Sequence, residues 1–283
     1  MAEPLSWSYS KSALFRDCPK AFSFEEQGVY PVTGHSPSVS LASIVGVSVH
    51  HSIKQEIDHW SRGERLELAR AEAAAEAFIR EVWADAPSRI CEARNGASLA
   101  SVSPERFIRL SRSRVRDFVR LIWPRFRNHT YLLHEEDRMF TIGDVVVWTR
   151  VDLCTRDADG QIVITDWKTG RIGPEEVEGM QLGVYVDWAR NEFHVPTGQV
   201  RGQIVSLRTL EFLPRFVSDA ELTRLRGRIT RQVQDWGKRF ETHNFPAAPS
   251  PTKCVSCRFF QWCDEGRAAV DARSLSGLAE MLD

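Results

Sequence analysis

The sequence predicts an α/β fold in which a mixed central β-sheet is flanked by helices. Three observations lead to this prediction: helical periodicity dominates the first 128 residues, strand patterns follow from 132 to 167, and a helix then precedes two further strands. This order is typical of a mixed sheet covered by helices. With 283 residues, 42% of them hydrophobic and 27% charged, the chain can bury a sizeable core as a soluble protein.

The N-terminal half is predicted to consist of helices joined by loops. Ser10 is the expected N-cap of the first helix, and Pro19 is expected to break that helix with Cys18 at the junction. Pro124 is expected to kink or end the last helix of this half. The predicted helices are 8–26, 43–60, 66–83 and 104–128, and the predicted loops are 30–40 and 87–103.

The C-terminal half alternates strands and helices. The predicted strands are 132–142, 145–153, 161–167, 199–207 and 210–217, and the predicted helices are 174–193, 219–241 and a short amphipathic one at 268–283. We expect four regions along the chain: an N-terminal segment at 1–30, a helical region at 31–130, a sheet-bearing core at 131–217, and a C-terminal part at 218–283.

The strongest chemical signal lies in a predicted β-hairpin with its turn at 157–160. Asp152 is placed near the end of its first strand, and Asp166 and Lys168 at the end of its second. Residues two apart on a strand share a face, so Asp166 and Lys168 point the same way, and hairpin pairing brings Asp152 within reach. Gln181 and Tyr185, four residues apart, share one face of the helix that follows.

Two carboxylates and an ammonium on one spot predict a binding site, because buried charges are costly unless they bind a metal or a substrate. A hydrolase of phosphodiesters needs these residue types. Carboxylates hold Mg²⁺ or Mn²⁺, and a lysine positions the attacking water and offsets negative charge. Asp152, Asp166 and Lys168 are therefore the candidate catalytic residues.

Composition neither favours nor excludes nucleic acid, because the formal net charge is −1 and any binding surface must come from local clustering. The stretch 104–128 carries eight arginines, which suit either a phosphate-tracking stripe or a solvated face paired with the acidic helix near 64–81. The helix at 219–241 adds four arginines between 224 and 231. Nine tryptophans suit either a core or base stacking.

Six cysteines are present, and their clustering indicates metal binding rather than disulfides in a cytoplasmic chain. A cytoplasmic location without membrane association is expected, because the sequence shows neither a signal-peptide pattern nor an apolar run that spans a bilayer. Cys254, Cys257 and Cys263 form a C-x2-C-x5-C pattern, one thiolate short of a four-coordinate site. Cys18 is the candidate for the fourth ligand.

The hairpin residues resemble a nuclease signature. Asp152 followed by Asp166-Trp167-Lys168 resembles the PD-(D/E)XK motif. Gln181-x-x-x-Tyr185 is similar to the QxxxY motif of the RecB-type exonuclease branch of that superfamily, and Gly46-x-x-x-His50 resembles its first motif. One cysteine before these motifs and three after them are similar to the iron–sulfur staple of AddB-type helicase–nuclease subunits and CRISPR adaptation nucleases.

The resemblance implies a restriction-endonuclease-like core with an N-terminal helical insertion and an iron–sulfur staple joining the termini. It further implies that Gln181 and Tyr185 contact DNA or support the site. The ligands implied for a divalent ion are His50, Asp152, Asp166 and the Trp167 backbone carbonyl. The ligands implied for a four-iron–four-sulfur cluster, with zinc as the alternative, are Cys18, Cys254, Cys257 and Cys263. Cys18 and Cys254 lie 236 residues apart. Cys91 and Cys154 are expected to be unliganded.

The function implied by the resemblance is a metal-dependent DNA nuclease, an exonuclease on single-stranded ends, that serves DNA repair or recombination, CRISPR adaptation or phage defence. Its expected partner is DNA, with a helicase or integrase subunit in a larger assembly, because the chain has no Walker A motif to drive unwinding. The alternative is a DNA-end-binding subunit of such an assembly with little activity alone. RNA stays open as a substrate.

Overall fold

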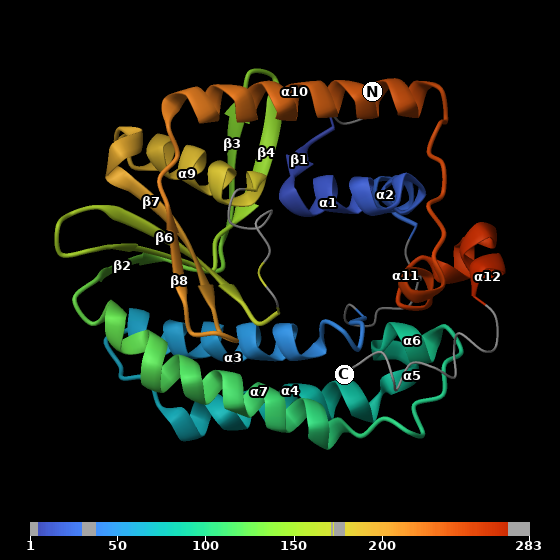
Figure 1. Cartoon of the computed structure of the whole chain (residues 1–283), viewed down its shortest axis with the longest axis horizontal. Helices are drawn as coiled ribbons and strands as arrows, with labels where there is room; N and C mark the ends of the chain where they lie inside the picture. Colours follow the sequence, from blue (N-terminus) through green and yellow to red (C-terminus); the bar gives the residue numbers. More distant parts are fainter. Residues whose placement is uncertain (1–4, 30–37, 171, 173–178, 271–283) are drawn as a thin grey trace. The chain divides into compact units, whose positions relative to one another are not determined.

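The computed structural model describes residues 5–29, 38–170, 172 and 179–270 (Figure 1). These residues divide into two compact units. The described residues of the first unit fall within 5–12, 54–67 and 116–244, and those of the second within 13–53, 68–115 and 245–270. The predicted start of a helix at 174 and most of the predicted terminal helix at 268–283 lie outside the described residues.

The first unit holds two mixed β-sheets, which confirms the predicted α/β class and the mixed strand order. The five-stranded sheet has the order β2-β5-β6-β7-β8, and the three-stranded sheet has the order β1-β4-β3. The strands are β1 Trp7–Ser8, β2 Thr130–Leu133, β3 Asp137–Ile142, β4 Val145–Arg150, β5 Leu153–Arg156, β6 Ile162–Lys168, β7 Val200–Ser206 and β8 Phe212–Arg215.

The parallel pair β6–β7 forms the centre of the larger sheet, and helix α9 (Met180–Glu192) connects its two strands. Residues Leu182 to Ala189 of α9 are all buried, because the helix contacts strands of both sheets and also helix α10 (Asp219–Glu241). Helix α10 begins at a capping box, in which Ser218 accepts from the Glu221 amide and Glu221 accepts from the Ser218 amide. Figure 1 shows α9 and α10 side by side.

Two predicted strands are each divided into two shorter ones. The predicted strand 132–142 becomes β2 and β3, and the predicted strand 145–153 becomes β4 and β5, so each crosses from one sheet to the other. The two breaks meet, because the Glu135 amide donates to the Val151 carbonyl at 2.8 Å. Asp152 therefore lies in a bend between two sheets and not, as the sequence suggested, near the end of a long strand.

The core beneath β6 is aromatic. Trp167 is 1% exposed, and its ring meets those of Phe118 and Phe126 edge-on at centroid distances of 5.2 and 5.6 Å. Trp7, Trp188 and Trp236 are also fully buried. Four of the nine tryptophans thus belong to the core, whereas Trp148 and Trp262 are exposed.

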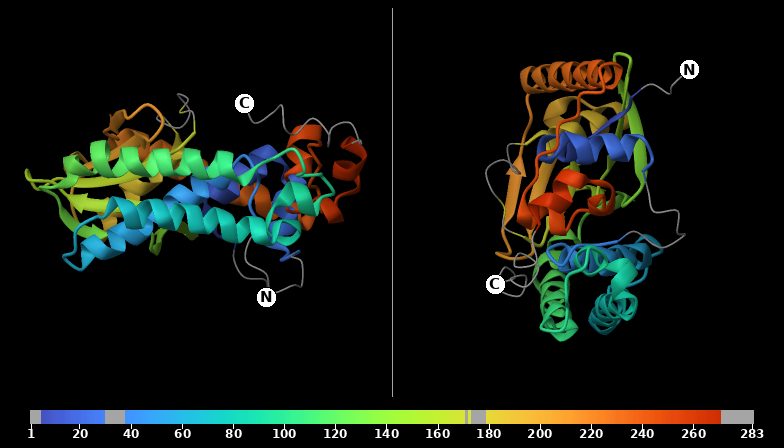
Figure 2. Two further views of the ribbon diagram at one scale, coloured as in Figure 1. Left: turned by 90° about the horizontal axis from the view of Figure 1, so that it is seen from below. Right: turned by 90° about the vertical axis from the view of Figure 1, so that its right-hand side faces the viewer.

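The second unit is helical, and its helices largely follow the prediction. Figure 2 shows α4 and α7 running side by side. The loop predicted at 87–103 contains two short helices instead, of four residues each. The helices begun or completed in this unit are α1 Tyr9–Asp17, α2 Pro19–Glu26, α3 Ile44–Ser61, α4 Leu68–Ala84, α5 Ala86–Arg89, α6 Cys91–Arg94, α7 Pro104–Asp117, α11 Pro251–Val255 and α12 Asp264–Ala269.

Two prolines end helices as predicted. Pro19 starts α2 directly after Cys18, which has extended backbone angles. Pro124 lies in the 3-10 turn η2 (Trp123–Phe126), and the π-helical turn η1 (Phe118–Ile122) precedes it, because a residue without an N–H cannot continue α-helical bonding. The predicted N-cap of α1, Ser10, is wrong. The helix already begins at Tyr9, and the hydroxyl of the preceding residue, Ser8, accepts from the Lys11 amide at 3.2 Å.

One arginine of α7 pairs with the acidic helix α4. Arg112 donates to Glu72 at 2.9 Å and to Glu76 at 3.2 Å. This contact favours the solvated, paired face over the phosphate-tracking stripe for this residue. Within the described ranges, no helix has both the length and the apolar character that crossing a membrane requires.

Candidate active site

The candidate site is built on the β5–β6 hairpin of the first unit. The strands pair antiparallel, with Leu153 opposite Thr165. Asp157 organises the turn, because its Oδ1 accepts from the amides of Asp159 and Gln161. Gly160 closes the turn at a φ of +83°, a left-handed conformation that glycine adopts without strain. The predicted hairpin is thus confirmed, with a shorter first strand.

Asp152 stands just before β5 and completes the pairing of the hairpin. Its Oδ2 accepts from the Trp167 backbone N–H at 2.7 Å. Strand β5 begins at Leu153, so this N–H lies one step beyond the last strand pair and takes a carboxylate in place of a carbonyl. The same hydrogen bond fixes Asp152 beside the end of β6.

Asp166 and Lys168 lie on one face of β6, as their spacing predicts. Asp166 is 3% exposed, and its Oδ2 lies 2.8 Å from Nζ of Lys168. Gln181 on α9 bridges the two side chains: its Nε2 donates to Oδ1 of Asp166 at 3.1 Å, and its Oε1 accepts from Lys168 at 3.2 Å. The Gln181 amide orientation that makes both bonds gives hydrogen-bond partners to the buried Asp166 and the half-buried Lys168.

Tyr185 closes this network from the next turn of α9. Gln181 Nε2 also donates to the Tyr185 hydroxyl, at 2.8 Å. Burial, followed by the charges of Asp166 and Asp152, raises the pKa of Tyr185 well above its usual value. The phenol is therefore neutral at physiological pH and acts as a hydrogen-bonding group, not as a base.

Lys168 is held as a cation. Burial alone would lower its pKa, but the nearby charge of Asp166, its hydrogen bond, and the charge of Asp152 outweigh burial, so the pKa is raised. A permanently charged ammonium does not take a proton from water. It can orient a water molecule and offset negative charge at a phosphate oxygen.

Glu135 is a carboxylate at the site that no sequence motif marked. Its carboxylate oxygen lies within 4.8 Å of one of Asp152, a spacing at which two acids can hold one cation. Its φ of +47° is unusual for a residue other than glycine, and its amide is held by the Val151 carbonyl. Glu135 lies between β2 and β3, which the sequence pattern joined into one predicted strand, so local sequence did not mark it as a site residue.

A buried histidine next to Glu135 anchors this bend. His134 is 6% exposed and hydrogen-bonds the Tyr131 hydroxyl at 3.0 Å through Nδ1. Its Nε2 lies 2.9 Å from the Asp58 carboxylate. With both ring nitrogens engaged, His134 fixes the backbone from which Glu135 projects.

His50 is half-buried on α3, in the second unit. The neighbouring His51 is exposed, and its ring lies 5.2 Å from that of Phe78 on α4, so the two histidines have different surroundings. Asp152, Asp166, Lys168, Gln181 and Tyr185 all meet within the first unit.

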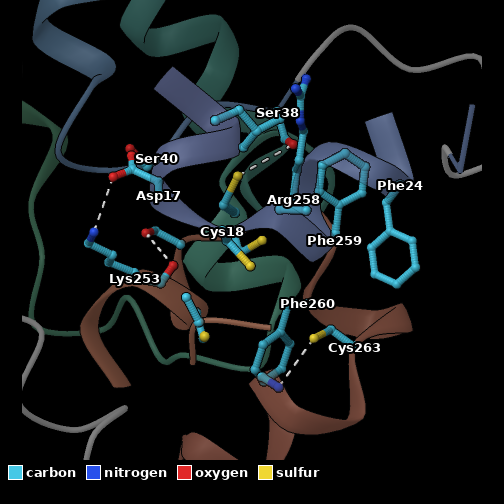
Figure 3. A pocket seen from close by; sticks show the side chains of 18 of the residues that line it. Asp17, Cys18, Phe24, Ser38, Ser40, Lys253, Arg258, Phe259, Phe260 and Cys263 are labelled. Carbon is cyan, nitrogen blue, oxygen red and sulfur yellow. Dashed lines mark hydrogen bonds and ion pairs between the residues drawn. The ribbon is translucent and has the colours of Figure 1, made fainter. Parts of the chain in front are cut away.

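The second unit contains a cavity of about 650 Å³ that four predicted ligands line: Cys18, Cys254, Cys257 and Cys263. Cys18 comes from the α1–α2 junction, and the other three come from the segment around α11 and α12. Figure 3 shows Cys18 and Cys263 in this cavity, with Phe24, Phe259 and Phe260 beside them. The chain thus brings together cysteines from distant parts of the sequence.

The thiols of this cavity influence one another. Burial, together with smaller effects of the nearby Cys254, Cys18 and Cys263, raises the pKa of Cys257 to about 11. Cys91 also lines the cavity, but its Sγ donates to Ser38 Oγ at 3.5 Å, and burial raises its pKa. Cys154 is fully buried in β5 of the other unit, with a pKa raised to about 12 by burial.

Asn95 holds the cysteine-bearing loop and had no sequence signal. Its Nδ2 donates to the carbonyls of Val255 at 2.8 Å and Cys257 at 3.0 Å. Helix α2 is tied to the same segment, because Lys20 donates to both oxygens of Glu265 at 2.8 and 2.6 Å. These hydrogen bonds hold the segments that line the cavity in place.

Comparison with known proteins identifies the family. A model described as the PD-(D/E)XK nuclease superfamily matches residues 6–264. The chain belongs to the PD-(D/E)XK nuclease superfamily, and family membership makes it a metal-dependent nuclease. This confirms the superfamily that the hairpin motif predicted. A search of the curated proteins finds no match.

Two solved structures are similar to this chain, one over a small part of it and one over most of it. A complex of EndoMS with double-stranded DNA is 30% identical over 28% of this chain and 28% of that chain, with a TM-score of 0.20. The crystal structure of SSO0001 is 14% identical over 93% of this chain and 98% of that chain, with a TM-score of 0.30. The family assignment rests on the family model and not on these structures.

Proposed function

We propose that the chain is a deoxyribonuclease that degrades DNA from single-stranded ends, in DNA repair or recombination, CRISPR adaptation or phage defence. One observation carries the proposal: Asp152, Asp166 and Lys168 converge at the end of one hairpin, with Gln181 bonded to both Asp166 and Lys168. Such a cluster of charges is costly for folding alone and suits a bound cation and a phosphate.

Asp152, Glu135 and Asp166 supply the carboxylate oxygens that Mg²⁺ or Mn²⁺ prefers, and His50 and the Trp167 carbonyl complete the proposed ligand set. A divalent ion bound there supplies a Lewis acid and a more acidic water. Lys168 offsets charge that develops on the phosphate. Gln181 and Tyr185 hold the side chains of Asp166 and Lys168 in position.

We also propose a four-iron–four-sulfur cluster on Cys18, Cys254, Cys257 and Cys263. The four thiols line one cavity of about 650 Å³, which is roomy for a single ion. A tetrahedral zinc site with Zn–S bonds of about 2.3 Å holds its sulfurs about 3.8 Å apart. Among the described residues, no three cysteine sulfurs lie within 4.8 Å of one another, so the proposal rests on the four cysteines that line one cavity and not on a closely spaced ligand group. A reducing, cytoplasmic location is part of the proposal and agrees with six free cysteines.

Cleavage of end-labelled DNA tests the function. Wild type and Lys168→Ala are incubated with single- and double-stranded DNA, and with RNA, in Mg²⁺ or Mn²⁺. Exposed Lys238→Ala on α10 serves as the matched control. We expect wild type and the control to cut single-stranded DNA, with a product ladder that gives the polarity, and Lys168→Ala to be slower by about 10²–10³-fold.

Two results would overturn the proposal. If Lys168→Ala cuts as fast as wild type, the activity does not arise at this site. If no protein cuts although the cluster is intact, the alternative function applies, a DNA-end-binding subunit that works with a helicase or integrase. Retention of labelled ends without cutting would then identify that role.

A further inference from the structure

A further cavity lies in the first unit, where the start of α9 meets α10. Its volume is about 230 Å³, and Gly179, Met180 and Gly183 of the α9 segment contribute to its wall. This volume falls below the roughly 300 Å³ at which pockets for drug-sized ligands begin. The cavity therefore suits a small group, such as one phosphate.

A close approach of the two helices forms the floor of this cavity. A Cβ added at Gly183 would lie 2.9 Å from Cδ2 of Leu225, so the glycine leaves room for the Leu225 side chain of α10 in its present position. One turn further along, Arg226 makes a two-pronged ion pair with the fully buried Asp187, at 2.8 and 2.6 Å. The helix pair is thus fixed, and the cavity walls with it.

The described lining of the cavity carries more positive than negative charge. Arg215, Arg224 and Arg228 belong to it, together with the carboxylate of Glu221. Glu221 is already engaged by the Ser218 amide and by Arg215, which lies 3.2 Å away. Arg224 and Arg228 are both exposed and stand four residues apart on α10, so they share one face. Among the described residues, neither has an ion-pair partner.

Arg224 and Arg228 differ from the arginine between them on α10. Arg226 pairs with the buried Asp187 and does not line the cavity. Two exposed guanidinium groups that face one small cavity suit an anion, because guanidinium matches phosphate geometry with two parallel hydrogen bonds.

The cavity and the candidate active site share the first turn of α9. Met180 lines the cavity, and the next residue, Gln181, contacts Asp166 and Lys168. A helix with its side chains is about 10–12 Å across, so the two sites stand within a few nucleotides of each other on a bound strand. A strand that reaches the catalytic carboxylates can place a neighbouring phosphate here.

We infer that Arg224 and Arg228 form a subsite for one backbone phosphate of the strand that is cut, a few linkages from the scissile one. The inference rests on the proposed nuclease function for its substrate. The subsite holds the strand by charge and not by base identity, so it contributes equally to all sequences.

Binding at varied salt concentration tests the subsite without any cleavage. Fluorescence anisotropy with a labelled single-stranded oligothymidylate in EDTA compares wild type with Arg224→Gln/Arg228→Gln. Arg231→Gln, on the same helix but outside the cavity, is the control. We expect the slope of log K against log salt to become shallower by about 0.7–1 in the double variant only. Equal slopes in all three proteins would overturn the inference.

Chemically modified oligonucleotides locate the phosphate. A series in which single linkages are replaced by neutral methylphosphonates should reveal one position that weakens wild-type binding and leaves the double variant unaffected. Sensitivity only to removal of a terminal phosphate would instead assign the cavity to strand ends and overturn the internal subsite. All substituted residues are exposed, and matching thermal midpoints would show intact folding.

The two proposals fail separately. Cleavage that depends on Lys168 together with an unchanged salt slope would reject the subsite and keep the nuclease. A changed slope together with no cleavage would keep the subsite and reject the nuclease.

Discussion

The Trp167 backbone N–H and the Asp152 carboxylate form a 2.7 Å hydrogen bond that links β6 to the residue just before β5. The bond gives Asp152 a structural task beside its proposed chemical one. Because the Trp167 side chain points into the aromatic core, the same residue links the core to the site.

Substitutions of Asp152 should separate these two tasks. Asp152→Asn keeps an acceptor for the Trp167 amide but loses the negative charge, whereas Asp152→Ala loses both. We expect both variants to lose cleavage. Urea denaturation should find Asp152→Ala less stable than Asp152→Asn by about 1–3 kcal/mol, because a buried donor is left unsatisfied. Equal stabilities would show that the hydrogen bond is not important for folding.

Gln181 should act as a positioning residue. Gln181→Leu removes the bridge between Asp166 and Lys168 and leaves both in place. We expect kcat to fall by about 10–100-fold with little change in KM, as for other residues that orient ligands. Tyr185→Phe, which removes only the outermost partner, should have a smaller effect. A larger loss in Tyr185→Phe than in Gln181→Leu would contradict this order.

The cysteine cavity predicts which thiols would hold the proposed cluster. Anaerobically purified Cys18→Ala and Cys257→Ala should lose iron and the brown absorbance, while Cys91→Ala keeps both. Loss of a link across so long a loop should lower the melting temperature by roughly 10 °C. Metal analysis that finds zinc and no iron in wild type would refute the cluster, and loss of iron in Cys91→Ala would change the ligand set.

The buried ion pair of Asp187 and Arg226 should be sensitive to loss of one partner. Asp187 has no exposed surface, so Arg226→Met leaves an uncompensated carboxylate and should reduce the free energy of unfolding by about 3–5 kcal/mol. The double variant Asp187→Leu/Arg226→Met should be closer to wild type. Denaturant unfolding of both variants measures these free energies. A double variant less stable than Arg226→Met would contradict the prediction.

The capping box of α10 should give a pH-dependent contribution to stability. The Ser218 amide, its hydroxyl and Arg215 lower the pKa of Glu221 to about 2. A lowered pKa stabilises the fold above the unfolded value near 4.5, and this contribution is lost as pH falls toward 2. Glu221→Gln should therefore be less stable than wild type at pH 7, by under about 1 kcal/mol because the side chain is partly exposed, and equally stable near pH 2. Denaturant unfolding between pH 2 and pH 7 measures the difference, and one that persists to pH 2 would contradict this assignment.

Much of the fold could be read from local pattern. Pro19 and Pro124 end helices where the missing N–H requires it, and the helix at 219–241 has the predicted bounds. The strands at 132–153 could not be divided correctly, because alternation of apolar residues continues through a change of sheet. The bend at Glu135 and Val151 depends on a hydrogen bond between distant segments.

The sequence by itself determined the superfamily and the hairpin residues Asp152, Asp166 and Lys168, because strand periodicity and a turn signal are local properties. Only the tertiary structure decided that Glu135 lies beside Asp152, that Gln181 bridges Asp166 and Lys168, and that Arg226 is structural while Arg224 and Arg228 face a cavity. Neighbouring arginines on one helix differ in role only through what packs against each face, and packing is set by the whole chain.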